Sequence, residues 1–159
     1  MPKTIEILGR KSLPKPVTTT IAELQTGRFD SLRVCVRGVV RNAEDRGELL
    51  GMRLHLGGVG GVFVADIKNI GDMKTNRLVD SEVELTGVVF SYFNLRSELL
   101  GFSLVAADTS EIVVLHEGLE DPFSAPVISL QRMRRFSLEG LTLNRQRLLG
   151  QVSYFRPGK

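Results

Sequence analysis

The sequence predicts an all-β domain with short helices, organised as a small barrel. Runs of alternating apolar and polar residues occupy 32–40, 50–56, 61–66, 82–93 and 99–107. Such alternation is typical of antiparallel strands that bury one face. The connections are short except for 67–81, which is long enough for an irregular or helical crossover. Three strands in a meander, a crossover and two more strands is the order of a five-stranded Greek-key OB-like barrel. An SH3-like barrel or a small sandwich gives a similar pattern.

The first two runs indicate which side chains face the core. In the first run, the expected inward residues are Leu32, Val34, Val36 and Val40, and the outward residues are Arg33, Cys35, Arg37 and Arg41. In the second run, the expected inward residues are Leu50, Met52, Leu54 and Leu56, and the outward residues are Arg53 and His55.

A short helix is expected before the barrel, within residues 18–30. Thr20 is the predicted N-cap, a glutamate follows three positions later, and Gly27 lies near the expected C-terminal end. The glycine-rich stretch 56–62 is similar to a phosphate loop, but a strand follows it and no Gly-Lys-Ser/Thr sequence occurs. We interpret this stretch as a hairpin turn.

Aromatic residues gather near the turn 93–98, which joins the last two predicted strands. Alternation along the strand places Phe93 on the core side. We therefore expect Phe93 and Phe102 to close one end of the barrel. Tyr92 is then expected on the outer face as a candidate contact residue.

The two ends of the chain repeat one pattern. An apolar strand at 5–8 recurs at 112–115, and Pro16-Val17 recurs as Pro126-Val127, about 110 positions later. Each Pro-Val precedes a helical segment and then a strand, in which Gly38 and Gly150 are equivalent. This period is typical of tandem domains.

The repeat predicts a domain organisation of three parts. Residues 1–16 are expected to be the end strand of a preceding module and a linker. Residues 17–116 form one complete OB-like module. Residues 117–159 are a linker and the start of a following, truncated module. On this hypothesis the chain is a piece of a tandem array, with partial modules on both sides of the complete one.

The order of these segments resembles a known family. The relevant stretches are ILGRKSLPKPVTTTIAELQTGRFDSLRVCVRGVV, VVFSYFNLRSELLGFSLV and the tail DPFSAPVISLQRMRRFS…LLGQVSYFRPG. They are similar to the extracytoplasmic tandem OB-like repeats of bacterial membrane-bound sensor histidine kinases and diguanylate cyclases. The resemblance implies a periplasmic location and neighbouring modules of the same receptor as partners. It implies contact with a membrane only through segments outside this chain, and it supplies no ligand-contact motif.

The residues indicate no catalytic or metal chemistry. His55 and His116 are the two histidines, and no Cys/His/Asp/Glu spacing suits zinc. No motif pairs a nucleophile with a base, and the single Cys35 lies in an apolar stretch, which favours an inert thiol. We therefore expect a non-enzymatic protein without a cofactor.

The sharpest candidate site is a basic stripe on the outer face. The candidate ligand or partner residues are Arg33, Arg37, Arg41, Arg53, His55, Phe63 and Tyr92. Arginines that track phosphates beside a ring that stacks on bases would suit single-stranded nucleic acid. Glu82 and Glu84 are expected on the neighbouring strand, however, where cross-strand pairs would neutralise arginines.

Three functions remain open after these observations. The favoured one is a non-enzymatic sensory or spacer module of a receptor, which binds an unknown small ligand or a protein. The first alternative is a single-stranded nucleic-acid-binding OB-fold protein that uses the basic strand face. The second alternative is a purely structural stalk domain. A mildly basic net charge of +3 does not by itself indicate nucleic acid.

Overall fold

The computed structural model describes residues 9, 11–129, 147–151, 153, 154 and 156. The strands are β1 (Val17–Thr19), β2 (Arg33–Asp45), β3 (Met52–Gly58), β4 (Gly61–Asn69), β5 (Glu82–Phe93), β6 (Leu99–Asp108), β7 (Ile112–His116), β8 (Val127–Ile128) and β9 (Arg147–Leu148). One short α-helix, α1 (Ile21–Leu24), and the 3-10 turns η1 (Thr75–Leu78), η2 (Thr109–Glu111) and η3 (Pro122–Ser124) complete the described elements.

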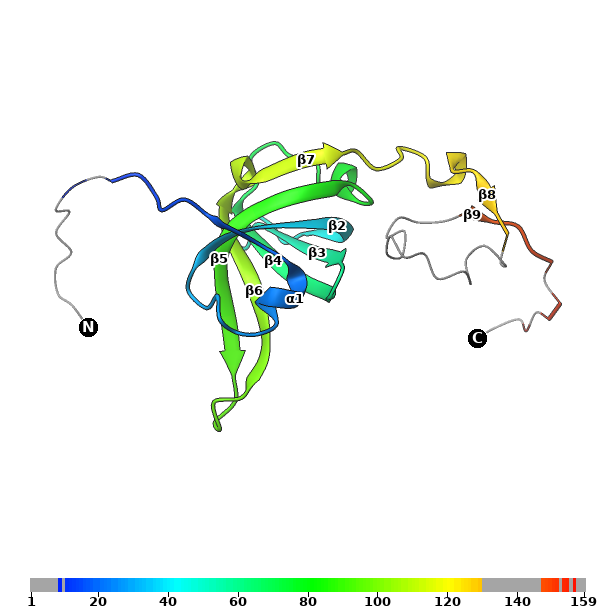
Figure 1. Ribbon diagram of the computed structural model, residues 1–159. Helices are drawn as coiled ribbons and strands as arrows, with labels where there is room; N and C mark the ends of the chain where they lie inside the picture. The colour runs from blue at the N-terminus through cyan, green and yellow to red at the C-terminus, as the bar shows by residue number, and fades with distance from the viewer. Residues whose placement is uncertain (1–8, 10, 130–146, 152, 155, 157–159) are drawn as a thin grey trace.

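Strands β2 to β6 close into a barrel. Hydrogen bonds join them in the order β2-β3-β4-β6-β5, and β5 pairs back onto β2. The β4–β6 pair is parallel, whereas the other pairs of the ring are antiparallel. This is the OB-fold, and the prediction of a five-stranded Greek-key barrel is confirmed. Strand β1 adds in parallel to β2, and β7 adds antiparallel to β5 (Figure 1).

The barrel interior is filled by the inward residues of all five strands. They include Val34, Val36, Val40, Met52, Leu54, Leu56, Phe63, Ala65, Ile67, Val83, Leu85, Val89, Leu104 and Ala106. Two predicted core residues lie outside: Leu32 is 46% exposed and Leu50 is 47% exposed. Both precede the first residue of their strand, where the chain has not yet entered the barrel.

Helix α1 covers one end of the barrel with its own apolar side chains, Ile21 and Leu24, which are buried in the core. Its N-terminus has the predicted capping box: the backbone N–H of Glu23 donates to Thr20 Oγ1, and the N–H of Thr20 donates to Glu23 Oε2. These reciprocal bonds satisfy two donors that the first helical turn leaves free. Gly27 follows the helix with a φ of 73°.

The glycine-rich stretch is a hairpin turn, as predicted. Gly58 pairs with Gly61, so Val59 and Gly60 form a two-residue loop between β3 and β4. The Gln25 side chain donates to the carbonyl of Gly60 at 2.6 Å and ties this loop to the segment after α1. The long connection between β4 and β5 contains η1, which confirms the predicted crossover.

Strands β5 and β6 continue beyond the barrel as a projecting hairpin (Figure 1). Its loop is held by Asn94, whose Oδ1 accepts from the backbone N–H groups of Arg96 and Glu98. The pairing shifts between Tyr92 and Phe93. Phe93 is therefore 49% exposed, and the prediction that it closes the barrel end is wrong. Phe102 is partly buried and packs against the core.

The segment after the barrel contains a second, smaller sheet. Strand β8 pairs in parallel with β9, through Val127 with Arg147 and Ile128 with Leu148. The strand predicted at 5–8 and most of the segment between β8 and β9 lie outside the described residues.

Candidate ligand-binding face

The outward residues of β2, β3, β4, β6 and β5 form one continuous surface, which we call the outer face. Strand register brings its members together in rows: Asn42 beside His55, His55 beside Val64, Val64 beside Ser103 and Ser103 beside Phe90. A second row joins Glu44, Arg53 and Asp66. In OB-folds the surface of the second and third barrel strands, with the loops beside it, is the usual ligand site. These strands are β3 and β4 here.

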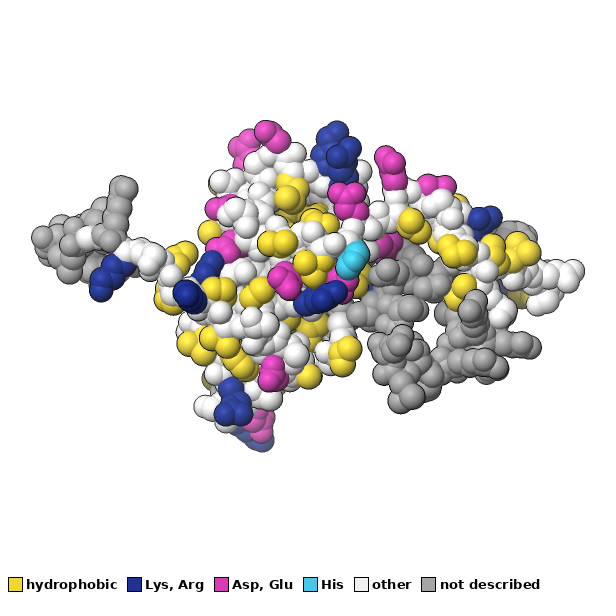
Figure 2. All heavy atoms as spheres, turned by 45° about the horizontal axis from the view of Figure 1, so that its top comes forward, with side chains coloured by type: hydrophobic (Ala, Val, Ile, Leu, Met, Phe, Trp, Pro, Cys, Tyr) yellow, Lys and Arg dark blue, Asp and Glu magenta, His cyan; other side chains and the backbone are white. Residues whose placement is uncertain are grey.

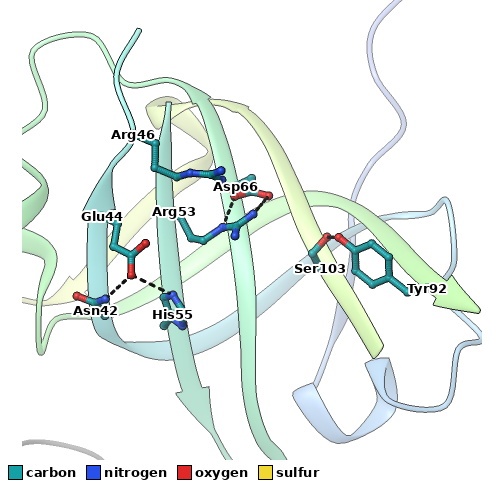
Figure 3. A network of polar contacts seen from close by, with 8 residues as sticks. All are labelled: Asn42, Glu44, Arg46, Arg53, His55, Asp66, Tyr92 and Ser103. Carbon is teal, nitrogen blue, oxygen red and sulfur yellow. Dashed lines mark hydrogen bonds and ion pairs between the residues drawn. The ribbon is translucent and has the colours of Figure 1, made fainter. Parts of the chain in front are cut away.

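An arginine–aspartate cluster lies at one end of the outer face. Arg53 donates from Nε and one terminal nitrogen to the two carboxylate oxygens of Asp66, at 2.8 and 3.0 Å. Arg46, from the β2–β3 loop, approaches the same carboxylate at 3.5 Å. Figure 3 shows both guanidinium groups converging on Asp66. The hydrogen bond from Arg53 lowers the pKa of Asp66, so this carboxyl stays ionised near neutral pH.

His55 belongs to a second polar group beside this cluster. Glu44 Oε1 accepts from the Asn42 amide at 2.8 Å and lies 3.5 Å from His55 Nε2 (Figure 3). Glu44 Oε2 and Asn42 Oδ1 have no hydrogen-bond partner among the described residues. These oxygens are free to accept a hydrogen bond from a ligand.

Two aromatic rings lie at the other end of the outer face. Phe90 and Tyr92 are 57% and 46% exposed, and their ring centroids are 5.4 Å apart in an edge-to-face arrangement. The Tyr92 hydroxyl is hydrogen-bonded to Ser103 Oγ at 2.9 Å, which fixes the ring against β6. Phe90 also lines a groove of about 420 Å³ with Val88 and Val105. The predicted outer position of Tyr92 agrees with the structure, and Phe90 is an addition to the predicted set.

The predicted basic stripe is mostly neutralised. Arg37 bonds Glu82 at 2.8 Å, on the neighbouring strand where that glutamate was expected. Arg33 bonds both carboxylate oxygens of Glu111 at 2.8 Å, a partner that the sequence pattern did not indicate. Arg41 makes no ion pair with the described residues. Figure 2 likewise shows basic and acidic side chains interspersed over the face that carries β7.

Phe63 is not part of the outer face. It is 3% exposed, lies opposite Leu56 in the β3–β4 register, and stacks on Phe102 with centroids 5.6 Å apart. Its predicted role as a base-stacking ring is therefore wrong, because the ring is a core residue. The sequence contained a signal for this placement. The two-residue turn at Val59-Gly60 fixes the register between β3 and β4, and in this register Phe63 lies opposite the inward Leu56.

Other chemical features of the described residues are few. No group of three or more His, Cys, Asp or Glu side chains among them could hold a metal ion. Cys35 is half-buried and is not in a disulfide. Within these same residues, no helix has the length and apolar character needed to cross a membrane.

Comparison with known proteins supports the fold alone. No protein-family model and no curated protein matches this sequence. A putative aspartyl-tRNA synthetase from Leishmania major Friedlin is similar in structure, with a TM-score of 0.51 and 15% identity over 75% of this chain. The match spans only 24% of the synthetase chain. The OB domain of a Methanosarcina mazei protein matches with a TM-score of 0.47 and 20% identity, over 68% of this chain and 95% of the other.

Proposed function

We propose that this chain is part of a tandem OB-fold array in the extracytoplasmic region of a bacterial membrane-bound signalling receptor. In this proposal the OB-fold domain is a non-enzymatic sensory or spacer module. Its outer face is the ligand site, and its linkers connect it to neighbouring modules of the same receptor. The sequence resemblance to sensor histidine kinases and diguanylate cyclases motivates the receptor assignment.

The observation that carries the proposal is a structural arrangement that occurs twice. Strand β1, which begins at the first Pro-Val, pairs in parallel with β2. Strand β8, which begins at the second Pro-Val, pairs in parallel with β9. A short strand that pairs in parallel with a later strand is thus present at both repeats. This supports residues 127–159 as the opening of a further module.

An arginine holds the preceding linker in both places. Arg33 is the first residue of β2 and donates to the backbone carbonyl of Pro14 at 3.0 Å. Arg147 is the first residue of β9 and donates to the backbone carbonyl of Phe123 at 2.6 Å. Each arginine thereby fixes the linker that precedes its own module. The two arginines are not equivalent in the strand register, since Val17 pairs with Val34, one position after Arg33, whereas Val127 pairs with Arg147 itself. The two contacts are therefore similar in kind and do not repeat one position.

Arg33 also connects the two linkers of the described module. The same guanidinium bonds Glu111, which lies directly before β7, and β7 leads into the C-terminal linker (117–126). That linker is held at its start, where the backbone N–H of Gly118 donates to Ser81 Oγ at 2.9 Å. A ligand that favours one arrangement of the barrel can therefore bias the direction of both linkers, which is a shift of populations along the array.

Spin-label distance measurement tests the joint. In a Cys35→Ser background, labels at Ser12→Cys and Ser124→Cys report the distance distribution between the two linkers. We expect a narrow distribution that broadens in Arg33→Gln, because glutamine cannot bond the carbonyl and the carboxylate together. Arg53→Gln is the matched control, since it removes an arginine–aspartate pair within the barrel that touches neither linker. Equal widths in all three proteins would contradict the proposed joint.

The cellular location needs its own experiment. In intact cells that express the natural full-length protein, a membrane-impermeant maleimide should label Ser124→Cys, because Ser124 is exposed in the C-terminal linker. Labelling that occurs only after cell lysis would place the module on the cytoplasmic side and remove the receptor assignment.

A further inference from the structure

A groove of about 420 Å³ lies on the outward side of β5 and β6, beside the linker that precedes β1. Its floor is apolar. Val88 lies opposite Val105, Phe90 lies two positions further along β5 towards the hairpin, and Ala107 lies two positions further along β6 in the opposite direction. Leu13, from the linker, also lines the groove. Leu13, Val88 and Phe90 are exposed to solvent, so a ligand that covers them removes apolar surface from water.

The sheet under the groove has no free backbone groups to offer a ligand. Val88 pairs with Arg33 on one side and with Val105 on the other. Val105 pairs in turn with Asp66. A peptide in the groove would lose water from its own N–H and C=O groups without gaining partners from these strands, which costs free energy. An alkyl chain has no such groups, so the floor of the groove suits an alkyl chain better than a polypeptide.

The length of the floor limits the length of that chain. Ser103, which pairs with Phe90, and Ala107 are four positions apart on β6. Four residues of a strand span about 13 Å. An extended alkyl chain advances by about 1.3 Å for each carbon–carbon bond, so about ten carbons fill this span.

One end of the groove carries a cation without an ion-pair partner. Lys68 lines the groove and lies beside Ala107 in the parallel register of β4 and β6. Its ammonium group forms no ion pair with the described residues. Arg33 and Glu111 are the other charged residues of the lining, and they bond each other through both carboxylate oxygens. The lining therefore has a net charge of +1, located at Lys68.

The charges around the groove do not neutralise this cation. Lys68 acts on the carboxylate of Asp66, but two guanidinium groups already lie against that carboxylate (Figure 3). The exposed Glu48 lines a neighbouring hollow with Lys68, without an ion pair between the two side chains. The remaining arginines on the outward side of β2, Arg37 and Arg41, do not line the groove.

We propose that this groove binds a medium-chain carboxylic acid. The alkyl chain lies on Val105 and Val88 with its methyl end at Phe90, and the carboxylate lies at the ammonium group of Lys68. Because Leu13 lines the groove, the bound chain also contacts the linker before β1. The groove is part of the outer face, so this inference rests on the proposed role of that face as a ligand site.

Isothermal titration calorimetry with hexanoate, octanoate and decanoate, each below its micelle concentration, tests the apolar part of the site. We expect one molecule bound per chain and an affinity that rises by about tenfold for each two carbons, as burial of CH₂ groups predicts. No saturable binding of decanoate, or an affinity independent of chain length, would overturn the proposal.

A comparison of octanoate with 1-octanol tests the head group. Octanoate should bind about threefold to fivefold more tightly, which is the contribution of one ion pair near the surface. Lys68→Gln should remove this difference and change the affinity for 1-octanol by less than about twofold. Lys74→Gln is the matched control, because Lys74 is an exposed lysine that lines a different hollow. Equal losses of octanoate affinity in the two variants would show that Lys68 does not hold the carboxylate.

A second pair of variants locates the alkyl chain. Phe90→Ala should weaken decanoate binding by about fivefold or more, because it removes a ring from the end of the groove. Phe93→Ala removes a similarly exposed ring from the same hairpin, outside the groove, and should change the affinity by less than about twofold. Equal losses in these two variants would place the chain elsewhere and overturn the proposal.

Other occupants of the groove give different results. Sedimentation with phosphatidylglycerol vesicles that is lost in Phe90→Ala would assign the groove to a bilayer surface. An apolar pentapeptide with a free carboxylate that displaced decanoate and bound more tightly would assign it to a protein partner. Either result would overturn the proposal. Failure with all the fatty acids leaves the spin-label test of the linker joint untouched, so the inference and the proposed function are judged by separate results.

Discussion

Replacing Gly51 by alanine should destabilise the barrel far more than replacing Gly47, although both glycines lie in the β2–β3 loop and both have a positive φ. The φ values are 72° for Gly51 and 80° for Gly47. A Cβ at Gly51 would overlap the carbonyl oxygen of Ile67 and lie 2.7 Å from that of Lys68. A Cβ at Gly47 would meet nothing within 4 Å. Gly47→Ala therefore measures the cost of the left-handed backbone alone, whereas Gly51→Ala adds the cost of a steric overlap.

The magnitudes follow from these two contributions. A left-handed backbone costs a non-glycine residue about 1–2 kcal/mol. Alanine also lowers the conformational entropy of the unfolded chain, which offsets about 0.4–1 kcal/mol of this cost. Gly47→Ala should therefore lower the free energy of unfolding by about 1 kcal/mol. Displacing the β4 backbone at Gly51 adds about 1–3 kcal/mol, for a total of about 2–4 kcal/mol.

Urea denaturation followed by far-ultraviolet circular dichroism measures both variants against the unchanged chain. With a slope of about 2 kcal/mol/M, the middle of the usual range for urea, Gly51→Ala should lower the midpoint by roughly 1–2 M, and Gly47→Ala by clearly less. If the two free energies of unfolding agreed within about 0.5 kcal/mol, the contact of Gly51 with β4 would not exist in solution, and the reasoning would fail.

Three further perturbations test other features of the fold. Thr20→Ala removes the capping box and should cost about 1 kcal/mol in the same urea assay, whereas no change would refute the cap. The pKa of Asp66 is held below its ordinary value by Arg53, so this carboxyl contributes stability above about pH 4 that is lost as the pH falls. Asp66→Asn should flatten the acid side of a stability-versus-pH curve, and an unchanged curve would contradict the ion pair. Phe63→Ala should cost about 3–5 kcal/mol because the ring is buried, whereas Phe90→Ala should cost less than about 0.5 kcal/mol. A larger stability loss in Phe90→Ala than in Phe63→Ala would contradict the buried position of Phe63 and the exposed position of Phe90.

Local patterns predicted most of the secondary structure. The five barrel strands were located from alternation, because a strand with one buried face repeats its hydrophobic pattern every two residues. The capping box was visible because Thr20 and Glu23 are three positions apart and interact within one helical turn. The same alternation that placed Tyr92 outside also places Phe90 there, so this part of the outer face was present in the sequence.

The errors lie where strands begin, end or change register. Leu32 and Leu50 continue the apolar pattern of their strands but precede the barrel, so they find no core to enter. Phe93 follows the alternation of β5, but an irregularity in the pairing with β6 changes its direction. A periodic pattern contains no information about where the packed interior stops.

The sequence by itself determined the strands, their order and the outward position of most charged residues, because these depend on neighbours a few positions apart. Only the tertiary structure decided which charges cancel. Arg33 and Glu111 are 78 positions apart, and barrel closure alone brings them to 2.8 Å. The closed sheet likewise aligned Glu44, Arg53 and Asp66 from three strands. Most arginines of the basic stripe thus became members of ion pairs. Ion pairs between strands depend on long-range register that local spacing does not contain.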